Sequence, residues 1–305
     1  MGWLLIAIIA YFLIALQSIL DKFLLSSRRI AHPATYAFYS GLLSLSAFLF
    51  FPFGFHLVSV ETAIQEIFSG CIFIYGALLL FFAIQNNEAS QVVPVVGAVT
   101  TIFTYFFSFI FLNEHLSIIN FLGIVALITG GLLISLNFSL GRLKRLFNGF
   151  LFSVIAGILL AFSFTWFKKF YLSDNFINVY IWTRIGLMLG AVSLLVYPYW
   201  RKVIGNSIIH LKKTQTKDEH SGIIFIENKI LGGLGSFLVN YAISLGSVTL
   251  VNALVSVEYV FIFGLAYLFS KWMKKIFEEE RDVFTLIRKF VAVGIIALGM
   301  FWISL

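Results

Sequence analysis

Charged residues are scarce in this chain: Asp, Glu, Lys and Arg make up 11% of its 305 residues, and hydrophobic residues make up 60%. An ordinary soluble domain carries about a quarter charged residues. The composition therefore leaves too few polar groups to cover a water-soluble fold of this length. We predict an all-α membrane protein, because a segment that crosses lipid must pair its backbone polar groups internally, as a helix does.

Motifs for metal binding, ATP binding and catalysis are also missing from the sequence. The single cysteine, Cys71, lies in an apolar run and can form neither an internal disulfide nor a multi-cysteine metal site. The absence of a Walker A motif argues against ATP-driven transport by this chain alone. We therefore expect no cofactor and no metal ion.

The placement of the histidines and basic residues narrows the function further. A lipid-modifying membrane enzyme needs clustered acidic residues or a paired His and Asp, yet all five His lie outside the apolar runs and no acidic cluster lies inside one. The net charge of +7 does not indicate nucleic acid, because the basic residues lie mostly between apolar runs. We expect neither an enzyme nor a nucleic-acid-binding protein.

Runs of roughly twenty apolar residues, each long enough to cross about 30 Å of hydrocarbon, predict ten membrane helices. They lie near residues 2–20, 35–53, 67–85, 90–112, 118–137, 149–170, 176–199, 230–248, 249–270 and 287–305.

The two halves of the chain are similar in sequence. The segment from Tyr75 aligns without a gap on the segment from Leu234, and the segment from Phe121 aligns on that from Phe290. Five helices per repeat is an odd number, so the second repeat must be inserted upside down relative to the first. Inverted repeats are a common plan of secondary transporters, with the substrate site between the repeats.

The distribution of Lys and Arg predicts the orientation. Eighteen of these residues lie in the odd-numbered connections between spans, whereas the even-numbered connections hold only Lys168 and Lys169. By the positive-inside rule, the odd connections face the cytoplasm and both termini face outward.

Residues 88–134 carry the features of a known family. They show a small residue and Ser that open a helix, Pro near its start, Glu in the following hairpin and a glycine-bearing helix that closes the segment. These residues are Ala89, Ser90, Pro94, Glu114, Gly123, Gly130 and Gly131. This pattern resembles the EamA-type repeat of the drug/metabolite transporter superfamily.

The resemblance implies the same two-times-five plan over nearly the whole chain. The first repeat would span residues 1–140, a linker residues 141–148 and the second repeat residues 149–305. Many relatives place basic residues so that both termini are cytoplasmic, which is opposite to the charge count here. The second repeat also departs from the pattern, with Ala253 at the position of Pro94.

The family also implies substrates and a location. Its substrate classes include amino acids, nucleotide precursors, sugars and drug-like compounds. We expect a secondary active transporter in the cell (inner) membrane of a bacterium or archaeon, with H+ or Na+ as the coupling ion; a homodimer is left open. The alternatives are an integral-membrane lipid-modifying enzyme and a channel.

Two charged residues, Arg184 and Glu258, are expected deep inside spans. A charge at the bilayer centre costs about 2.5–3.5 kcal/mol on an insertion scale, so each should face the bundle interior or a wet cavity. Counting residues from the span ends places Arg184, Glu258 and Asn240 at one membrane level. Arg184 would bind an anionic group and Glu258 a cation, an amine or a proton; the alternative is a buried structural ion pair.

Polar residues at helical spacing accompany these charges and predict an inward-facing seam in both halves. The predicted substrate-binding set is Arg184, Glu258, Asn240, Tyr241, Tyr180, Ser244, Thr101 and Tyr36. The alternative for the hydroxyl and small residues is that they only let helices approach and hydrogen-bond.

Overall fold

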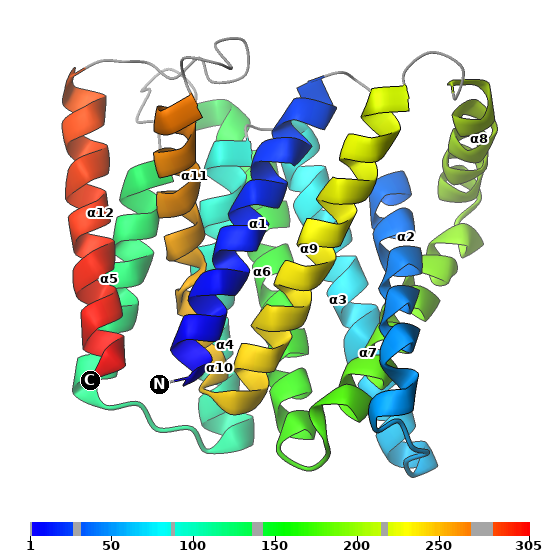
Figure 1. Cartoon of the computed structure of the whole chain (residues 1–305), viewed down its shortest axis with the longest axis horizontal. Helices are drawn as coiled ribbons and strands as arrows, with labels where there is room; N and C mark the ends of the chain where they lie inside the picture. The colour runs from blue at the N-terminus through cyan, green and yellow to red at the C-terminus, as the bar shows by residue number, and fades with distance from the viewer. Residues whose placement is uncertain (1, 27–31, 87–88, 136–142, 215–218, 270–282) are drawn as a thin grey trace. The chain divides into compact units, whose positions relative to one another are not determined.

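A computed structural model describes residues 2–26, 32–86, 89–135, 143–214, 219–269 and 283–305 of the chain. All regular elements in these ranges are helices (Figure 1). Nine helical segments of the described residues are long and apolar enough to cross a membrane. The prediction of an all-α membrane protein with many spans is therefore confirmed, although the number ten is not.

The eighth predicted span, residues 230–248, accounts for this difference. It lies in α9, Glu219–Leu245, which is not among the nine candidates. Buried Asn228 and Asn240 and neighbouring Lys229 interrupt the apolar sequence of α9, so its composition alone does not mark it as a span.

Other predicted spans are longer or broken in the structure. α3 begins at Val60, before the predicted start at 67, and the predicted span 249–270 consists of two helices that meet at Leu254. The second span continues after α2 as the 3-10 helix η1. The charged connections at 27–31, 136–142 and 270–282 lie outside the described residues, so the orientation stays a prediction.

The helices form two compact units, and each unit draws segments from both halves of the chain. Unit 1 comprises α1 (Gly2–Ser26), α5 (Ile118–Ser135), α9 (Glu219–Leu245), α10 (Val248–Ala253), α11 (Val255–Phe269) and α12 (Val283–Ser304). Unit 2 comprises α2 (Pro33–Leu43), η1 (Ser44–Phe53), α3 (Val60–Asn86), α4 (Ala89–Leu112), α6 (Leu143–Tyr171), α7 (Phe176–Ser193), η2 (Leu194–Val196) and α8 (Pro198–Thr214). α6 begins at Leu143, which lies within the predicted linker 141–148.

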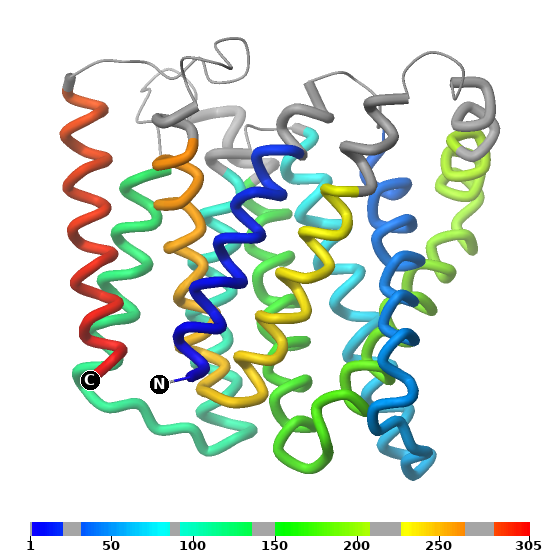
Figure 2. The backbone as a smooth tube through the Cα atoms, in the orientation of Figure 1, coloured from blue at the N-terminus to red at the C-terminus, as the bar shows by residue number. Residues whose placement is uncertain are grey.

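Glycines bring the helices of unit 1 together. On α5, a Cβ added to Gly130 would lie 2.6 Å from Cγ1 of Ile296 on α12, so the missing side chain permits the close contact. α1 and α9 run side by side in opposite directions (Figure 1, Figure 2), and Gly235 of α9 faces Ile14 of α1. The N- and C-termini lie at the same end of this unit (Figure 1).

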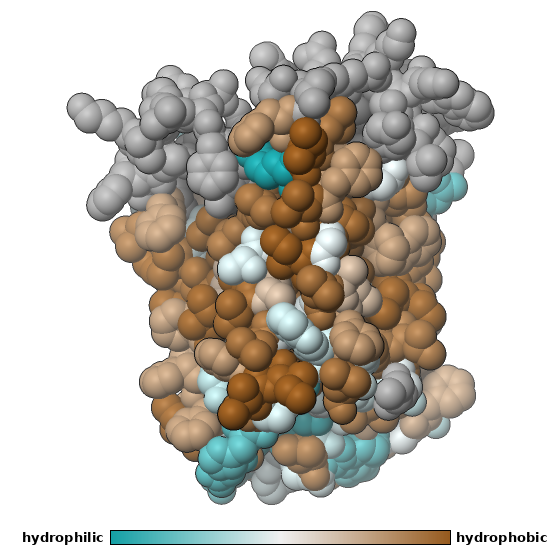
Figure 3. Space-filling model, turned by 90° about the vertical axis from the view of Figure 1, so that its left-hand side faces the viewer, coloured by the Kyte–Doolittle hydropathy of each residue, from teal (hydrophilic) through white to brown (hydrophobic). Residues whose placement is uncertain are grey.

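The outer surface of α12 suits a lipid environment. It exposes Phe284, Phe290, Leu298 and Phe301. The face of the molecule shown in Figure 3 is hydrophobic over most of its height, and hydrophilic residues gather at its lower end. Burial of these side chains against acyl chains removes the apolar surface that water would disfavour.

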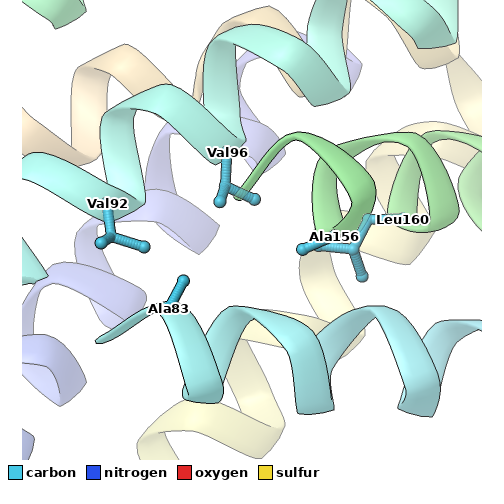
Figure 4. Packing of buried hydrophobic residues seen from close by; sticks show 5 residues of the cluster. All are labelled: Ala83, Val92, Val96, Ala156 and Leu160. Atoms are coloured by element: carbon cyan, nitrogen blue, oxygen red, sulfur yellow. The ribbon is translucent and has the colours of Figure 1, made fainter. Parts of the chain in front are cut away.

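Unit 2 has a core at the junction of α3, α4 and α6. Ala83, Val92, Val96, Ala156 and Leu160 are buried there and point toward one another (Figure 4). α3 also crosses α7 at Gly70 and Gly186, where an added Cβ would collide with the carbonyl oxygens of Thr183 and Ile67. The two backbones therefore touch at this crossing, which fixes the height of α3 against α7.

Candidate functional site

Glu258 lies at a helix break in unit 1. α10 ends at Ala253, α11 begins at Val255, and Glu258 occupies the first turn of α11. Its side chain is buried, and the Ser18 hydroxyl of α1 donates a hydrogen bond of 2.9 Å to its Oε1. A carboxylate in the first turn of a helix interacts favourably with the helix dipole. The Ser18 hydroxyl and the first turn of α11 therefore both stabilise a negative charge on this buried carboxyl group.

Two buried tyrosines surround this carboxyl group. Tyr11 and Tyr259 both lie within electrostatic range of Glu258. The Tyr11 hydroxyl donates to the backbone oxygen of Val251 in α10 at 2.9 Å, and the Ser256 hydroxyl donates to the backbone oxygen of Leu127 in α5 at 2.6 Å. Hydrogen bonds on both sides therefore hold the broken helix segment in place.

The three predicted residues of α9 differ in exposure. Asn240 is buried, and its Nδ2 donates to the backbone oxygen of Ser236 at 2.8 Å. Tyr241 is 36% exposed, because adjacent residues of a helix point in directions about 100° apart. Ser244 is half-buried and donates to the Tyr241 carbonyl at 2.7 Å. Asn240 and Tyr241 therefore do not present one common face of α9.

Arg184 and Tyr180 form a pair in unit 2. Both are buried in α7, one turn apart, and the guanidinium carbon lies 4.3 Å from the centre of the tyrosine ring. This cation–π contact offsets part of the cost of removing the guanidinium from water. Tyr171 of α6 lies within electrostatic range of both.

Thr101 and Tyr36, also in unit 2, have local contacts. Thr101 is buried, and its hydroxyl donates to the Gly97 carbonyl of its own helix at 2.9 Å. Tyr36 is half-buried, with its ring 4.6 Å from that of Phe81 in an edge-to-face arrangement. These contacts fit the alternative in which such residues serve helix packing.

The predicted set is thus divided between the units. Unit 1 holds Glu258, Asn240, Tyr241 and Ser244, and unit 2 holds Arg184, Tyr180, Thr101 and Tyr36. That Arg184 and Glu258 lie at one membrane level and line one site stays a prediction.

Glu66 is a further buried charged residue, in addition to Arg184 and Glu258. Glu66 of α3 lies inside a candidate span and its side chain has no exposed surface. The predicted span began at residue 67, one position after Glu66, so this glutamate was assigned to a connection. The pattern of Glu66, Ser69 and Gly70 on one helix face, spaced by three and four residues, could have revealed it.

A polar cluster lies where α7 begins. The Asp174 carboxylate accepts a hydrogen bond of 2.6 Å from Asn178 and lies 3.1 Å from Nε2 of His56. The Asn178 side-chain oxygen accepts from the His56 backbone N–H at 3.0 Å. Because Asn175 caps α7 and also donates to the Gly54 carbonyl, the cluster ties the end of η1 to the start of α7.

Glu114 and Lys169 each have a defined contact. Glu114, matched to the family's hairpin glutamate, accepts a hydrogen bond of 3.3 Å from Thr249 of α10. Lys169 lies 5.2 Å from the centre of the Trp166 ring, at the end of α6.

Within the described ranges, no group of three or more His, Cys, Asp or Glu could hold a metal ion.

Comparison with known proteins identifies the first part of the chain. Residues 1–136 match the model of the EamA-like transporter family, which confirms the resemblance seen in the sequence. Members of this family are membrane transporters rather than enzymes. The chain is therefore an integral, multi-pass membrane protein, and its residues 1–136 match a family of membrane transporters.

Solved structures support the fold over the full length. Twenty chains match, and one of them, described as "Crystal structure of protein", covers 100% of this chain and 98% of its own. Its TM-score is 0.66 and its sequence identity is 14%, so the likeness shows the fold alone. No curated protein is detectably similar to the chain.

Proposed function

We propose that the whole chain, whose residues 1–136 match the model of the EamA-like transporter family, is a secondary active transporter of a small organic metabolite. It works by alternating access between two inverted five-helix repeats, residues 1–140 and 149–305. The observation that carries the proposal is the buried Glu258 at a helix break inside a membrane segment. Broken helices at mid-membrane are typical substrate and ion sites of such transporters.

The helix bounds support the repeat. The alignment that places Tyr75 on Leu234 also places the ends of α3, Val60 and Asn86, on the ends of α9, Glu219 and Leu245. It places Pro94 of α4 on Ala253, next to the break at Leu254. α9 is then the equivalent of a candidate span, which favours ten crossings over nine.

Helix packing within each unit supports the same correspondence. In unit 2, α6 packs on α3 and α4. In unit 1, α1 packs on α11 and approaches α9 at Gly232 and Gly235. Because α1 and α6 each open a repeat, each unit pairs the first helix of one repeat with the third and fourth helices of the other.

The two charged residues have complementary roles in this proposal. Glu258, held by Ser18, binds an amine of the substrate or the coupling ion, H+ or Na+. Arg184, covered by the Tyr180 ring, binds an anionic group. An amino-acid-like compound carries both kinds of charged group, whereas a nucleotide precursor or a drug-like cation carries one. Asn240 and Ser244 add hydrogen-bonding groups on α9.

A ligand screen with purified protein tests this function. Melting temperatures are measured with amino acids, nucleosides and organic cations, one compound at a time. Loss of a charged hydrogen-bond partner costs about 1.5–3 kcal/mol, so Arg184→Ala or Glu258→Gln should weaken a stabilising compound's binding about 10- to 100-fold. Glu61→Gln, at an exposed position of α3, is the control. A compound that binds both site variants as tightly as the wild type places the substrate elsewhere.

Flux measurements in proteoliposomes then separate a transporter from a channel. A transporter shows saturation with substrate concentration and counter-exchange of labelled for unlabelled compound. Proton-coupled uptake should be lost in Glu258→Gln while the variant keeps the wild-type melting temperature within a few degrees. Flux that rises linearly with concentration would instead indicate a channel.

A further inference from the structure

Glu66 is a buried carboxyl group that the proposed mechanism does not use. It lies on α3, and its side chain has no exposed surface. Among the residues that the structure describes, neither of its carboxyl oxygens has a hydrogen-bond partner. An ionised carboxylate in such an environment is strongly disfavoured and takes up a proton instead.

The packing around Glu66 favours a proton over any larger ligand. Neighbouring atoms cover both carboxyl oxygens so closely that no water molecule fits against them. Na+ needs several oxygen ligands around it, and an ammonium group needs a comparable space. A proton needs only one oxygen lone pair and almost no volume.

Two titratable groups lie near Glu66. Asp174, in the connection between α6 and α7, is its main charged neighbour, and Tyr171 of α6 also lies within electrostatic range. Tyr171 is in turn within range of Tyr180 and Arg184 on α7. The Asp174 carboxylate therefore repels a negative charge on Glu66, which adds to the effect of burial.

Exposure rises in steps from Glu66 to the surface. The side chain of Glu66 is 0% exposed, that of Asp174 is 21% exposed and that of His56 is 51% exposed. Asp174 lies 3.1 Å from Nε2 of His56, which is hydrogen-bonding distance. The same ring's Nδ1 lies 3.3 Å from the Gly54 carbonyl, so a doubly protonated ring would donate to both acceptors.

We propose that Glu66 is an occluded proton-binding site of unit 2 and that Asp174 and His56 connect it to the surface. In the occluded conformation neither Glu66 oxygen has a hydrogen-bond partner among the described residues, so release requires the side chain to move until its O–H reaches the Asp174 carboxylate. The O–H bond then breaks, Asp174 accepts the proton, and the imidazole of His56 takes up that proton at one ring nitrogen and gives one to water from the other. Uptake runs in reverse. The site is separate from Glu258 and does not depend on the role proposed for that residue.

Infrared spectroscopy of the purified full-length protein tests the site without transport. A protonated carboxylic acid has a C=O stretch separate from those of carboxylates and amides. This band should be present in the wild type at neutral pH, should lose intensity in Glu66→Gln, and should be unchanged in the matched variant Glu61→Gln. A spectrum of Glu66→Gln with undiminished band intensity would overturn the proposal. Glu258→Gln, measured in parallel, separates any contribution from unit 1.

A second measurement and one further variant complete the test. Glu66→Gln should also keep the wild-type melting temperature within about 2 °C, because an amide has the size and neutrality of a protonated carboxyl group; a charged, paired glutamate would lose far more. If Glu66→Gln does not fold, Glu66→Asp should shift the band frequency, and an unshifted band would contradict the assignment.

The route is tested by hydrogen–deuterium exchange of the same band. On transfer to D2O, the band should shift at least about tenfold more slowly in Asp174→Asn than in the wild type, since the amide cannot accept and pass on the proton. Equal exchange rates would exclude Asp174 from the path.

Discussion

Two buried glutamates, one in each unit, have opposite surroundings. Glu258 lies in the first turn of a helix, next to a break, and accepts a hydrogen bond from Ser18. Glu66 lies within continuous α3, and its carboxyl oxygens have no partner in the described part of the chain. Depth alone therefore does not define a carboxyl group's chemistry. A supported carboxylate can bind a cation, whereas an unsupported one favours a bound proton.

The helix contacts of the two units differ in a similar way. In unit 2, a Cβ on Gly70 of α3 would collide with the backbone oxygen of Thr183 in α7. In unit 1, a Cβ on Gly130 of α5 would lie 2.6 Å from the Ile296 side chain and no closer than 3.1 Å to the backbone of α12. Backbone cannot move aside without shifting a helix, whereas an isoleucine can adjust its rotamer. Unit 2 should thus tolerate an added methyl group less well.

Substitution of these glycines should give the largest effect. Gly70→Ala should cost about 3 kcal/mol, at the upper end for overpacking, and Gly130→Ala about 1 kcal/mol. The melting temperatures in detergent measure this difference. Gly264→Ala on α11 is the control, because nothing lies within 4 Å of its added Cβ. Equal losses for Gly70→Ala and Gly130→Ala would show that the two crossings are alike.

The hydrogen bond of Glu258 gives the next prediction. Ser18→Ala removes the donor and should cost about 1–2 kcal/mol, because the carboxyl group stays buried. Ser304→Ala, whose hydroxyl donates to the Phe301 carbonyl near the end of α12, should cost almost nothing. If Ser18→Ala melts at the temperature of the control, Glu258 does not rely on this donor.

Helix capping provides the smallest effect. Nδ1 of His32 accepts a hydrogen bond of 3.2 Å from the backbone N–H of Ala34 at the start of α2 in unit 2. In unit 1, the hydroxyl of Ser247 accepts from Leu250 at the start of α10. Alanine at either position should cost about 0.5–1 kcal/mol.

Only the cap of unit 2 should depend on pH. Partial burial lowers the pKa of His32, so the unfolded chain binds this proton more tightly than the folded protein does. The contribution of neutral His32 to the free energy of unfolding is therefore complete above the pKa of the unfolded chain, about 6.5, and is lost as the pH falls below that pKa. The wild-type melting temperature should fall more steeply on acidification than that of His32→Asn, which keeps a cap without titrating. Ser247→Ala should leave the wild-type slope unchanged; parallel curves for His32→Asn and the wild type would refute the cap's role.

The sequence predicted the site only in part. Glu258 and Arg184 stood out because a charge inside an apolar run is costly, and both are buried. Glu66 was missed because residues 60–66 are polar enough to be taken for a connection, whereas α3 continues through them. Ser18 was also missed as the donor to Glu258, because the two residues are 240 positions apart.

Composition and periodicity by themselves determined that this chain lies in a membrane as a set of helices, because lipid permits few backbone structures and a helix that crosses it needs a long apolar run. The motif residues in 88–134 carried the resemblance to EamA-type transporters. Only the tertiary structure decided where the ninth predicted span breaks, that helices of the two halves mix within each unit, and which buried carboxyl group has a partner. Those features depend on contacts between residues distant in the chain, such as Ser18 with Glu258 and Gly70 with α7. Local hydropathy depends only on residues that are neighbours in the sequence, so it does not reveal such contacts.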